Sequence, residues 1–394
     1  MADLNLGPRM GGTAAIAGVG ETKIGLVPDQ GSFQMYVESV RLALADAGLS
    51  RGDVDILVTA SSRTDPHLYH CQFVAEYMGM LPKHCLTLQT GGASTLGALT
   101  FIVAMIASGA AEVAVVAAAD NVATGMTTTG VMQSMSEGGS HPSFEVPFGL
   151  LIPGMYALIA RRHMHEFGTS REQMAAVAVA ARRHAALTDK AQKKDPISID
   201  DVLSSRPIAK PLHLLDCCLL SDGGGAFVVV SSRLARQLPH PPAQILGIAE
   251  AHRWEHISQA AEITTTAAAE SGRRAFAMAG LRPSDVAAAI LYDAFTILPI
   301  VFLEDLGFCQ KGEGGAFVEG GRIELGGELP VNTHGGLLSY CHPGRSGAIF
   351  GLIEAVRQVR GECGGRQVPN ADVVLVHNEG GIASTNATML LGRA

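Results

Sequence analysis

The sequence has no CxxC pair, no sustained run of basic residues and no apolar segment long enough for a membrane span. Its seven cysteines are an odd number and include only one adjacent pair, Cys217 and Cys218, so we expect reduced thiols and no metal site. Residues 85–111 lack charge, but their apolar part, residues 96–111, is too short to cross a bilayer comfortably. We expect a buried helix there and no membrane contact.

Positive charge is also scarce. The chain has 29 Lys and Arg against 37 Asp and Glu, a net charge of -8, and its basic residues occur as scattered pairs such as Arg161 and Arg162. This pattern gives no cationic stripe that could neutralise phosphates, which excludes nucleic acid as an expected partner. Residues 1–4 show no basic region leading into an apolar one, so we expect a cytoplasmic protein.

The composition provides enough apolar residues for a large hydrophobic core. Of its 394 residues 47% are hydrophobic and 17% charged, enough for two domain-sized units. Apolar runs alternate with alanine-rich stretches, which predicts an α/β fold. We expect strands at residues 13–19, 55–59 and 113–119, and helices at residues 37–47 and 96–107.

The order of these segments recurs. Residues 45–60 resemble residues 277–292, with an Ala-Gly-Leu and an Asp-Val at matching places. The next helix and strand recur as residues 347–359 and 373–376, so we predict an internal duplication. The expected N-terminal half spans residues 1–235 and the C-terminal half residues 236–394.

Two segments interrupt this order. Residues 123–206 are turn-rich and polar around an amphipathic helix at 171–183, and we interpret them as an inserted loop region that shapes a pocket. Residues 307–331 are glycine-rich and show no obvious long helix.

Three glycine-bearing strand-to-helix corners are candidate binding sites, at residues 89–95, 332–347 and 377–381. Such corners present backbone N–H groups to ligands at helix N-termini. The second corner holds Asn332, a Gly-Gly pair, His342-Pro343 and a Gly-x-Ser-Gly stretch, and Ser221 begins an Asp-Gly-rich turn. In these features, and in their order along nearly the whole chain, the sequence resembles the thiolase superfamily.

The resemblance implies a thiolase fold, with two duplicated βαβαβ halves in an α-β-α-β-α arrangement of five layers. His342 matches the catalytic histidine of the family. Three other catalytic positions differ: Gly92 replaces the nucleophilic cysteine, His377 the second cysteine and Tyr292 the asparagine of the Asn-Glu-Ala-Phe segment. No acyl-enzyme can form at residue 92.

Residues 207–212, 215–218 and 304–309 resemble the sterol-carrier, or lipid-transfer-protein-type, branch of the superfamily. This branch includes retro-aldolases of steroid side-chain degradation that lack the cysteine nucleophile and use tyrosines. Tyr292, in a Tyr-Asp-x-Phe-Thr segment, and Tyr340, two residues before His342, match those tyrosines.

A retro-aldol cleavage needs a base for the β-hydroxyl proton and donors for the thioester enolate. The resemblance implies that one of Tyr292 and Tyr340 takes that proton and the other returns one. His342 with N–H groups around Gly92 and Gly381 would hold the thioester oxygen, with Asp293 among the substrate-binding residues and His377 among the catalytic ones. Coenzyme A enters only as part of the substrate, and no permanent cofactor is expected.

Other interpretations remain open. Each tyrosine could be an ordinary packed residue, His377 could cap or pack at its corner, and Gly92 could serve a tight turn or close helix packing. The chain could be an acyltransferase or Claisen-type condensing enzyme with an unrecognised nucleophile, or a non-catalytic acyl-CoA or lipid-binding subunit. As partners the resemblance implies a second copy, as a homodimer, and a small zinc-ribbon and OB-fold protein.

Overall fold

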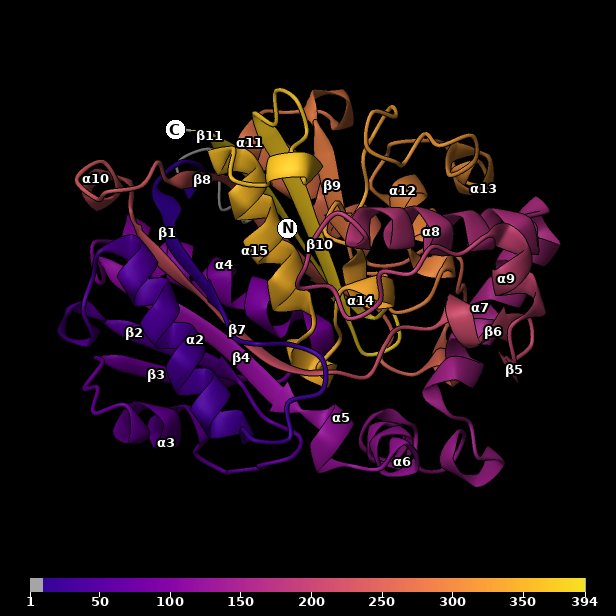
Figure 1. Cartoon of the computed structure of the whole chain (residues 1–394), viewed down its shortest axis with the longest axis horizontal. Helices are drawn as coiled ribbons and strands as arrows, with labels where there is room; N and C mark the ends of the chain where they lie inside the picture. Colours follow the sequence, from indigo (N-terminus) through magenta and orange to yellow (C-terminus); the bar gives the residue numbers. More distant parts are fainter. Residues whose placement is uncertain (1–9, 394) are drawn as a thin grey trace.

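The computed structural model of the protein describes residues 10–393, and the side chains of residues 135–138 lie outside this description. Its centre is one mixed sheet flanked by helices (Figure 1). Among the described residues the strand order is β3-β2-β4-β7-β1-β8-β11-β10-β9. These strands are β1 (Ala14–Glu21), β2 (Ile56–Ala60), β3 (His84–Leu88), β4 (Val113–Asn121), β7 (Asp222–Ser231), β8 (Ala243–His252), β9 (Ala288–Leu291), β10 (Val373–Gly380) and β11 (Thr385–Arg393).

The sheet repeats one pattern on both sides of the β1–β8 contact. β2 runs parallel to β4, and β4 antiparallel to β7, which pairs with β1. In the second half β9 runs parallel to β10, and β10 antiparallel to β11, which pairs with β8. Next to β9, a parallel bridge from Ala289 to Val331 occupies the place that β3 occupies next to β2. The duplication expected from the sequence is therefore present in the topology. The boundary at residue 235 stays a prediction, and it falls between α10 (Ser232–Ala235) and β8.

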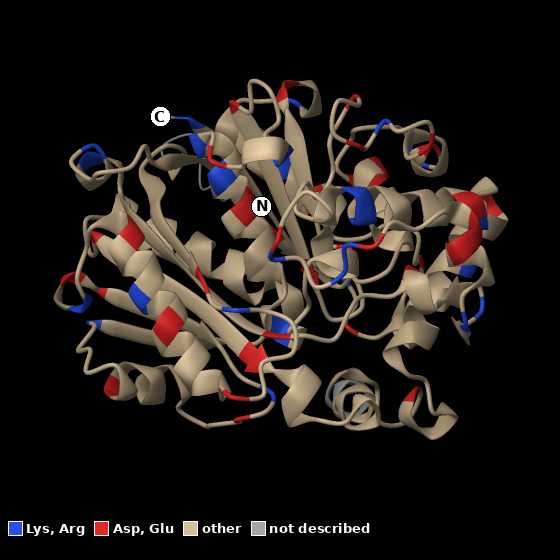
Figure 2. Cartoon of the chain, viewed as in Figure 1, with Lys and Arg blue, Asp and Glu red and all other residues tan. Residues whose placement is uncertain are grey.

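Helices form three layers around the two halves of the sheet. α2 (Ser32–Ala47) packs on β1, β7 and β4, and α11 (Ala268–Ala279) packs on β8 and β11. α4 (Ser94–Ala107) and α15 (Ala348–Arg360) contact strands of both halves and lie between them. α3 (His70–Tyr77) and α12 (Ile297–Asp305) complete the outer layers. This is the expected five-layered arrangement, and few Lys, Arg, Asp and Glu residues lie along the central strands (Figure 2).

Glycine sets how closely the layers approach. A Cβ on Gly18 would lie 2.2 Å from the Ala43 carbonyl oxygen, and one on Gly20 would lie 2.4 Å from that of Ser39. Since real Cβ atoms do not approach that near, β1 and α2 require glycine at both positions. Among the described residues no helix is both long and apolar enough to span a membrane.

The region at residues 123–206 is mostly helical. The helix expected at 171–183 is present, and the further helices correct the expectation of a turn-rich loop. Its apolar residues recur at helical spacing and pack against α12. It contains α5 (Val122–Gly125), α6 (Thr128–Gly139), α7 (Ile152–Phe167), α8 (Arg171–Ala185) and α9 (Ile199–Ser204), and the short strands β5 (Pro207–Ala209) and β6 (Leu212–His213) follow it. We call residues 122–206 the helical cover. Residues 307–331 hold only the one-turn helix α13 (Gly314–Phe317) among described elements, and α14 (Gly336–Ser339) follows them.

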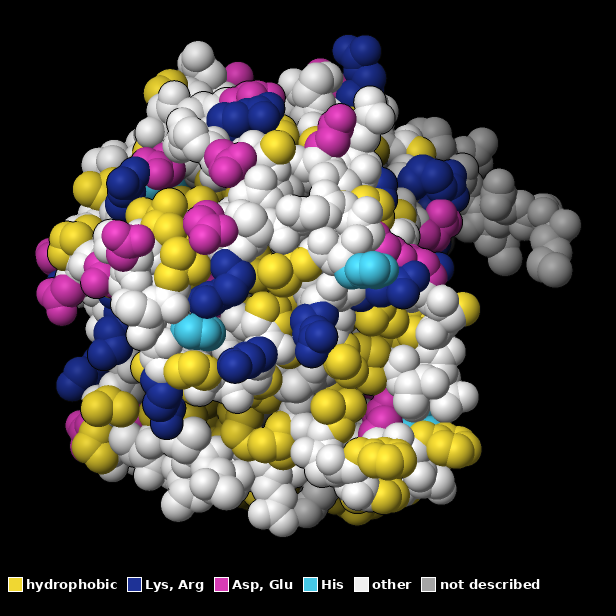
Figure 3. All heavy atoms as spheres, turned by 90° about the vertical axis from the view of Figure 1, so that its right-hand side faces the viewer, with side chains coloured by type: hydrophobic (Ala, Val, Ile, Leu, Met, Phe, Trp, Pro, Cys, Tyr) yellow, Lys and Arg dark blue, Asp and Glu magenta, His cyan; other side chains and the backbone are white. Residues whose placement is uncertain are grey.

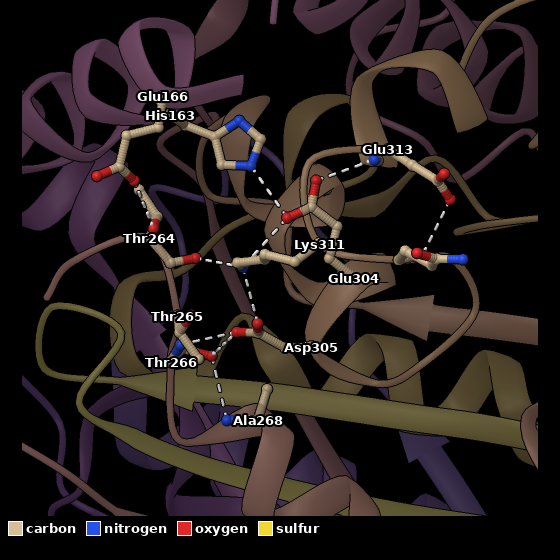
Figure 4. A network of polar contacts seen from close by, with 12 residues as sticks. His163, Glu166, Thr264, Thr265, Thr266, Ala268, Glu304, Asp305, Lys311 and Glu313 are labelled. Atoms are coloured by element: carbon tan, nitrogen blue, oxygen red, sulfur yellow. Dashed lines mark hydrogen bonds and ion pairs between the residues drawn. The ribbon is translucent and has the colours of Figure 1, made fainter. Parts of the chain in front are cut away.

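A buried ionic network fastens the helical cover to the C-terminal half (Figure 4). His163 of α7 contacts Glu304 of α12 at 3.0 Å, and Lys311 contacts the same carboxylate at 3.1 Å and Asp305 at 2.9 Å. Asp305 in turn accepts the Thr266 N–H at 2.7 Å. Burial raises the pKa of Glu304, but His163 and Lys311 outweigh it and hold that pKa below its usual range.

Candidate active site

The three glycine corners meet at one end of the central helices. Residues Gly91–Ala93 form a 3-10 turn before α4 that contacts the end of β10 and the turn before α15. A Cβ on Gly380 would lie 1.7 Å from the Thr90 carbonyl oxygen, so the first and third corners touch through backbone atoms. Both Gly91 and Gly381 have positive φ, 62° and 68°, which favours glycine at these turns.

Tyr292 and His342 form a side-chain pair at this junction. The Tyr292 hydroxyl lies 3.3 Å from His342 Nε2, and the rings are nearly perpendicular, at 81°. The Tyr292 N–H donates to the His377 carbonyl at 2.9 Å, which fixes the residue after β9. Tyr292 is 9% exposed and His342 5%. The pair is therefore almost enclosed by protein.

Burial decides the protonation of His342. It lowers the pKa to about 4, opposed only in part by the Leu219 carbonyl, so the imidazole is neutral at neutral pH. The backbone N–H of His342 donates to Ser221 Oγ at 2.8 Å. A Cβ on Gly347 would lie 2.4 Å from the His342 imidazole, so the ring is closely packed. A neutral imidazole with its proton on Nδ1 can accept the phenolic proton of Tyr292.

Gly92 has no room for a side chain. A Cβ there would lie 2.4 Å from Tyr292 Cε2 and 2.7 Å from the Glu379 carbonyl oxygen. Tyr292 thus occupies the space into which a cysteine at residue 92 would point. The two departures seen in the sequence, Gly92 and Tyr292, are sterically coupled.

A phenol–carboxyl pair, Tyr156 and Glu379, borders the same junction. The Tyr156 hydroxyl of α7 donates to Glu379 Oε1 at 2.6 Å, and the Ala383 N–H donates to Oε2 at 2.9 Å. Burial raises the pKa of Glu379 to about 7. Burial raises the pKa of Tyr292 well above its usual value, and the charge of Glu379 raises it further. Sequence reasoning missed both residues, because Tyr156 lies in no motif and Glu379 was noted only as part of its corner.

Tyr340 lies in a different network. Its hydroxyl donates to Glu21 Oε2 at 2.9 Å, and Glu21 Oε1 binds Arg357 at 2.7 Å and also contacts Lys190. Burial and the charge of Glu21 raise the pKa of Tyr340 well above its usual value. The structure therefore brings Tyr292 and His342 together but directs the Tyr340 hydroxyl elsewhere. Glu21, at the end of β1, carried no sequence signal.

The remaining predicted residues frame the pair. Both ring nitrogens of His377 are engaged, Nδ1 with Thr388 at 2.9 Å and Nε2 with Asn386 at 3.0 Å, and its ring packs on Phe302. Asp293 Oδ1 accepts the Leu337 N–H at 2.7 Å, and burial raises the pKa of Asp293 to about 7. These contacts favour a structural part for His377 and a positioning part for Asp293.

Known proteins resemble this chain in sequence and in fold. Residues 249–393 match the family model described as "Thiolase C-terminal domain-like". Over 365 residues the chain is 42% identical to a steroid side-chain-cleaving aldolase of Thermomonospora curvata, covering 89% of this chain and 91% of that protein. The chain belongs to the thiolase superfamily.

Further relatives locate it within this superfamily. The chain is 37% identical over 366 residues to a 17-hydroxy-3-oxo-4-pregnene-20-carboxyl-CoA lyase of Mycobacterium tuberculosis, covering 89% of this chain and 92% of that protein. Among solved structures, an "Ltp2-ChsH2(DUF35) aldolase" superposes with a TM-score of 0.86 at 39% identity, covering 98% of both chains. The resemblance inferred from the sequence, and the fold that it implied, are confirmed.

Proposed function

We propose that this thiolase-superfamily enzyme cleaves a bulky β-hydroxyacyl-CoA by a retro-aldol reaction, giving a short acyl-CoA and a ketone or aldehyde. The observation that carries the proposal is Tyr292, whose ring excludes a side chain at residue 92 and whose hydroxyl faces a neutral His342. The site has lost the thiolase nucleophile and gained a proton acceptor in its place. The names of the two relatives support a steroid-derived acyl group as one substrate.

The proposed reaction needs no covalent intermediate. The substrate hydroxyl gives its proton to the Tyr292 oxygen while the phenolic proton moves to His342 Nε2. The Cα–Cβ bond breaks, its electron pair forms the thioester enolate, and the Cβ–O bond becomes a carbonyl. The proton then returns from His342 to Cα. N–H groups at Gly92 and Gly381 are proposed to hold the enolate oxygen, with Asp293 fixing the turn beside them.

We assign the hydroxyl proton to Tyr292 rather than Tyr340, because the Tyr340 hydroxyl is engaged with Glu21. Tyr292 and His342 are nearly enclosed, so substrate entry requires movement of a covering segment. Arg63, whose charge acts on both Tyr292 and His342, donates a 2.9 Å hydrogen bond to Ser134 of α6.

The test is product analysis by mass spectrometry with a β-hydroxyacyl-CoA that carries a tertiary alcohol, in the absence of free CoA. We expect a short acyl-CoA and a ketone in equal amounts. Tyr292→Phe should lower kcat by about 10² to 10⁴, and Tyr77→Phe, at an exposed tyrosine of α3, should not. Cleavage only after CoA is added would instead show thiolysis.

Thiolysis is the second candidate, because the chain is also 32% identical over 383 residues to an acetyl-CoA acetyltransferase of Methanothermobacter thermautotrophicus. The crowding at Gly92 argues against it. Binding of the CoA thioester without any turnover would favour an acyl-CoA or lipid-binding subunit.

We further propose a homodimer that forms along β3. This strand is at the edge of the sheet and pairs only with β2 among the described strands, and Phe101 of the adjacent α4 is 37% exposed. An edge strand with apolar neighbours favours pairing with another chain. Light scattering should give a dimer that Phe101→Glu converts to a monomer, and Leu187→Glu, on the helical cover, should leave it intact.

A small partner protein of the zinc-ribbon and OB-fold type is also proposed. The solved Ltp2-ChsH2(DUF35) structure supports it, and apolar side chains gather on the face seen in Figure 3. Exposed apolar residues of the cover include Phe144, Val146, Phe148 and Leu151. Co-purification with a co-expressed DUF35 protein should be lost in Phe148→Ser and kept in Tyr77→Ser.

A further inference from the structure

Glu379 is a buried carboxyl group without a cation. Of the four other buried glutamates, three are neutralised by a cation: Glu21 by Arg357, Glu304 by Lys311 and Glu354 by Arg366. The fourth, Glu145, accepts two backbone N–H groups and lies 3.7 Å from a His256 ring nitrogen. Glu379 is 2% exposed, and among the described residues its carboxyl group forms no ion pair. Burying a carboxylate without a cation costs free energy, so its pKa rises. Both the charged and the neutral form of such a group then need hydrogen-bond partners.

Tyr156 can form a hydrogen bond with either form of Glu379. Its ring stacks on Phe295, with centroids 4.5 Å apart, and its hydroxyl lies 2.6 Å from Glu379 Oε1 and 3.3 Å from the Gly381 carbonyl oxygen. When Glu379 is ionised, the Tyr156 hydroxyl donates to it. When Glu379 is protonated, its O–H can donate to the Tyr156 oxygen, and the Tyr156 hydroxyl turns to the Gly381 carbonyl. Ala383 N–H donates to the second carboxyl oxygen in both states.

Glu379 lies beside the proposed proton acceptor. Its main-chain carbonyl oxygen is 2.7 Å from the point where a Gly92 Cβ would lie, and that point is 2.4 Å from the Tyr292 ring. Besides burial, the charge of its carboxyl group raises the pKa of Tyr292. When the phenolic proton moves toward His342 ahead of the arriving substrate proton, partial negative charge develops on the Tyr292 oxygen. A carboxylate at Glu379 opposes this charge, and a neutral carboxyl group does not.

We propose that Glu379 and Tyr156 are positioning residues that hold a proton beside Tyr292, and that the reaction proceeds only while Glu379 is protonated. This inference rests on the proposed function. The titratable and charged groups around Glu379 and Tyr292 are Tyr156 of the cover, His342, Asp293, Cys218, Arg63 and, near Ser384, Glu255.

The charge of Glu379 sets the direction of the expected pH dependence. Since burial raises the pKa of Glu379 to about 7, the protonated form dominates below pH 7 and is lost as pH rises. The rate should therefore fall on the alkaline side. Asp293, whose pKa burial also raises to about 7, is the group that could imitate this effect.

Glu379→Gln tests the inference, because glutamine mimics the protonated carboxyl: its N–H₂ can donate to Tyr156 and its oxygen can accept from Ala383. We expect the alkaline fall in kcat to disappear, so that at one pH unit above the wild-type midpoint the variant turns over about tenfold faster than wild type. KM should change less than twofold. Tyr156→Phe removes the donor to ionised Glu379 and should move the alkaline limb to higher pH.

Two outcomes overturn the inference: an unchanged alkaline limb in Glu379→Gln, or a folded Glu379→Gln that is inactive at every pH. Infrared difference spectra give a reading that is independent of turnover. A protonated-carboxyl band that titrates near pH 7 should vanish in Glu379→Gln and persist in Asp293→Asn. If the band is present but wild type cleaves no substrate, the proposed function fails and the titrating pair stands. If cleavage occurs without the band, the pair fails and the function stands.

Discussion

Substitution of Gly92 by alanine tests the steric relation at the centre of the site. The added Cβ would lie 2.4 Å from Tyr292 Cε2, about 1 Å closer than an ordinary carbon–carbon contact. The Glu379 carbonyl oxygen, a backbone atom of β10, is 2.7 Å from the same Cβ and cannot move independently. The ring of Tyr292 must therefore shift, and its hydroxyl must leave His342.

Overpacking of this kind costs about 1 to 3 kcal/mol, and the rigid backbone on one side places Gly92→Ala near 3 kcal/mol. The free energy of unfolding is measured by urea denaturation. Tyr292→Phe keeps the ring and should not relieve the clash, so the cost of Gly92→Ala should persist in that background. Tyr292→Ala removes the ring, and in that background the cost of Gly92→Ala should fall by about 1 to 3 kcal/mol.

Retro-aldol activity should be lost in Gly92→Ala because Tyr292 is displaced. The reasoning is refuted if Gly92→Ala lowers stability by less than about 0.5 kcal/mol and retains wild-type kcat. It is also refuted if Gly92→Ala lowers the free energy of unfolding by the same amount in the Tyr292→Ala and Tyr292→Phe backgrounds. Gly92→Cys should behave like Gly92→Ala, which makes restoration of a thiolase nucleophile dependent on removal of Tyr292.

Three further predictions concern the networks around the site. Tyr340→Phe should cost about 2 kcal/mol of stability, since Glu21 loses a donor, and a fall of kcat beyond about a hundredfold would instead give Tyr340 a chemical role. His377 has its pKa lowered to about 3 by burial, so the unfolded state binds the proton first and stability declines below about pH 6.5, by about 1.4 kcal/mol per pH unit. His377→Gln should reduce that slope in urea titrations across pH 4 to 6.5, and an equal slope would contradict it. Lys311→Met should cost about 2 to 3 kcal/mol, because Glu304 stays buried while Lys311 is 30% exposed, and an unchanged unfolding midpoint would show that Lys311 does not stabilise the buried charge of Glu304 in the network of Figure 4.

The fold could be predicted from the sequence because it depends on local patterns of residues. Strand and helix periodicity, the recurring Ala-Gly-Leu segments and the glycine corners each depend on a few neighbouring residues. The helical cover was read as loop because its helices lie among turn-rich polar stretches. Only the amphipathic helix at 171–183 was predicted there, and the apolar residues of α7 show their role in the packing against α12.

For the site, motif and order along the chain identified Tyr292, His342 and the loss of the cysteine at Gly92. They could not show that Tyr292 fills the space beside Gly92, because that contact joins residues 200 positions apart. The sequence treated Tyr292 and Tyr340 alike, and only the tertiary structure directed one hydroxyl to His342 and the other to Glu21. Nor could it reveal Tyr156 and Glu379, since the charge of a carboxyl group depends on burial and on partners brought from distant elements. The sequence thus determined which chemical groups are present and on which corners, while three-dimensional packing decided which of them meet and which are neutral.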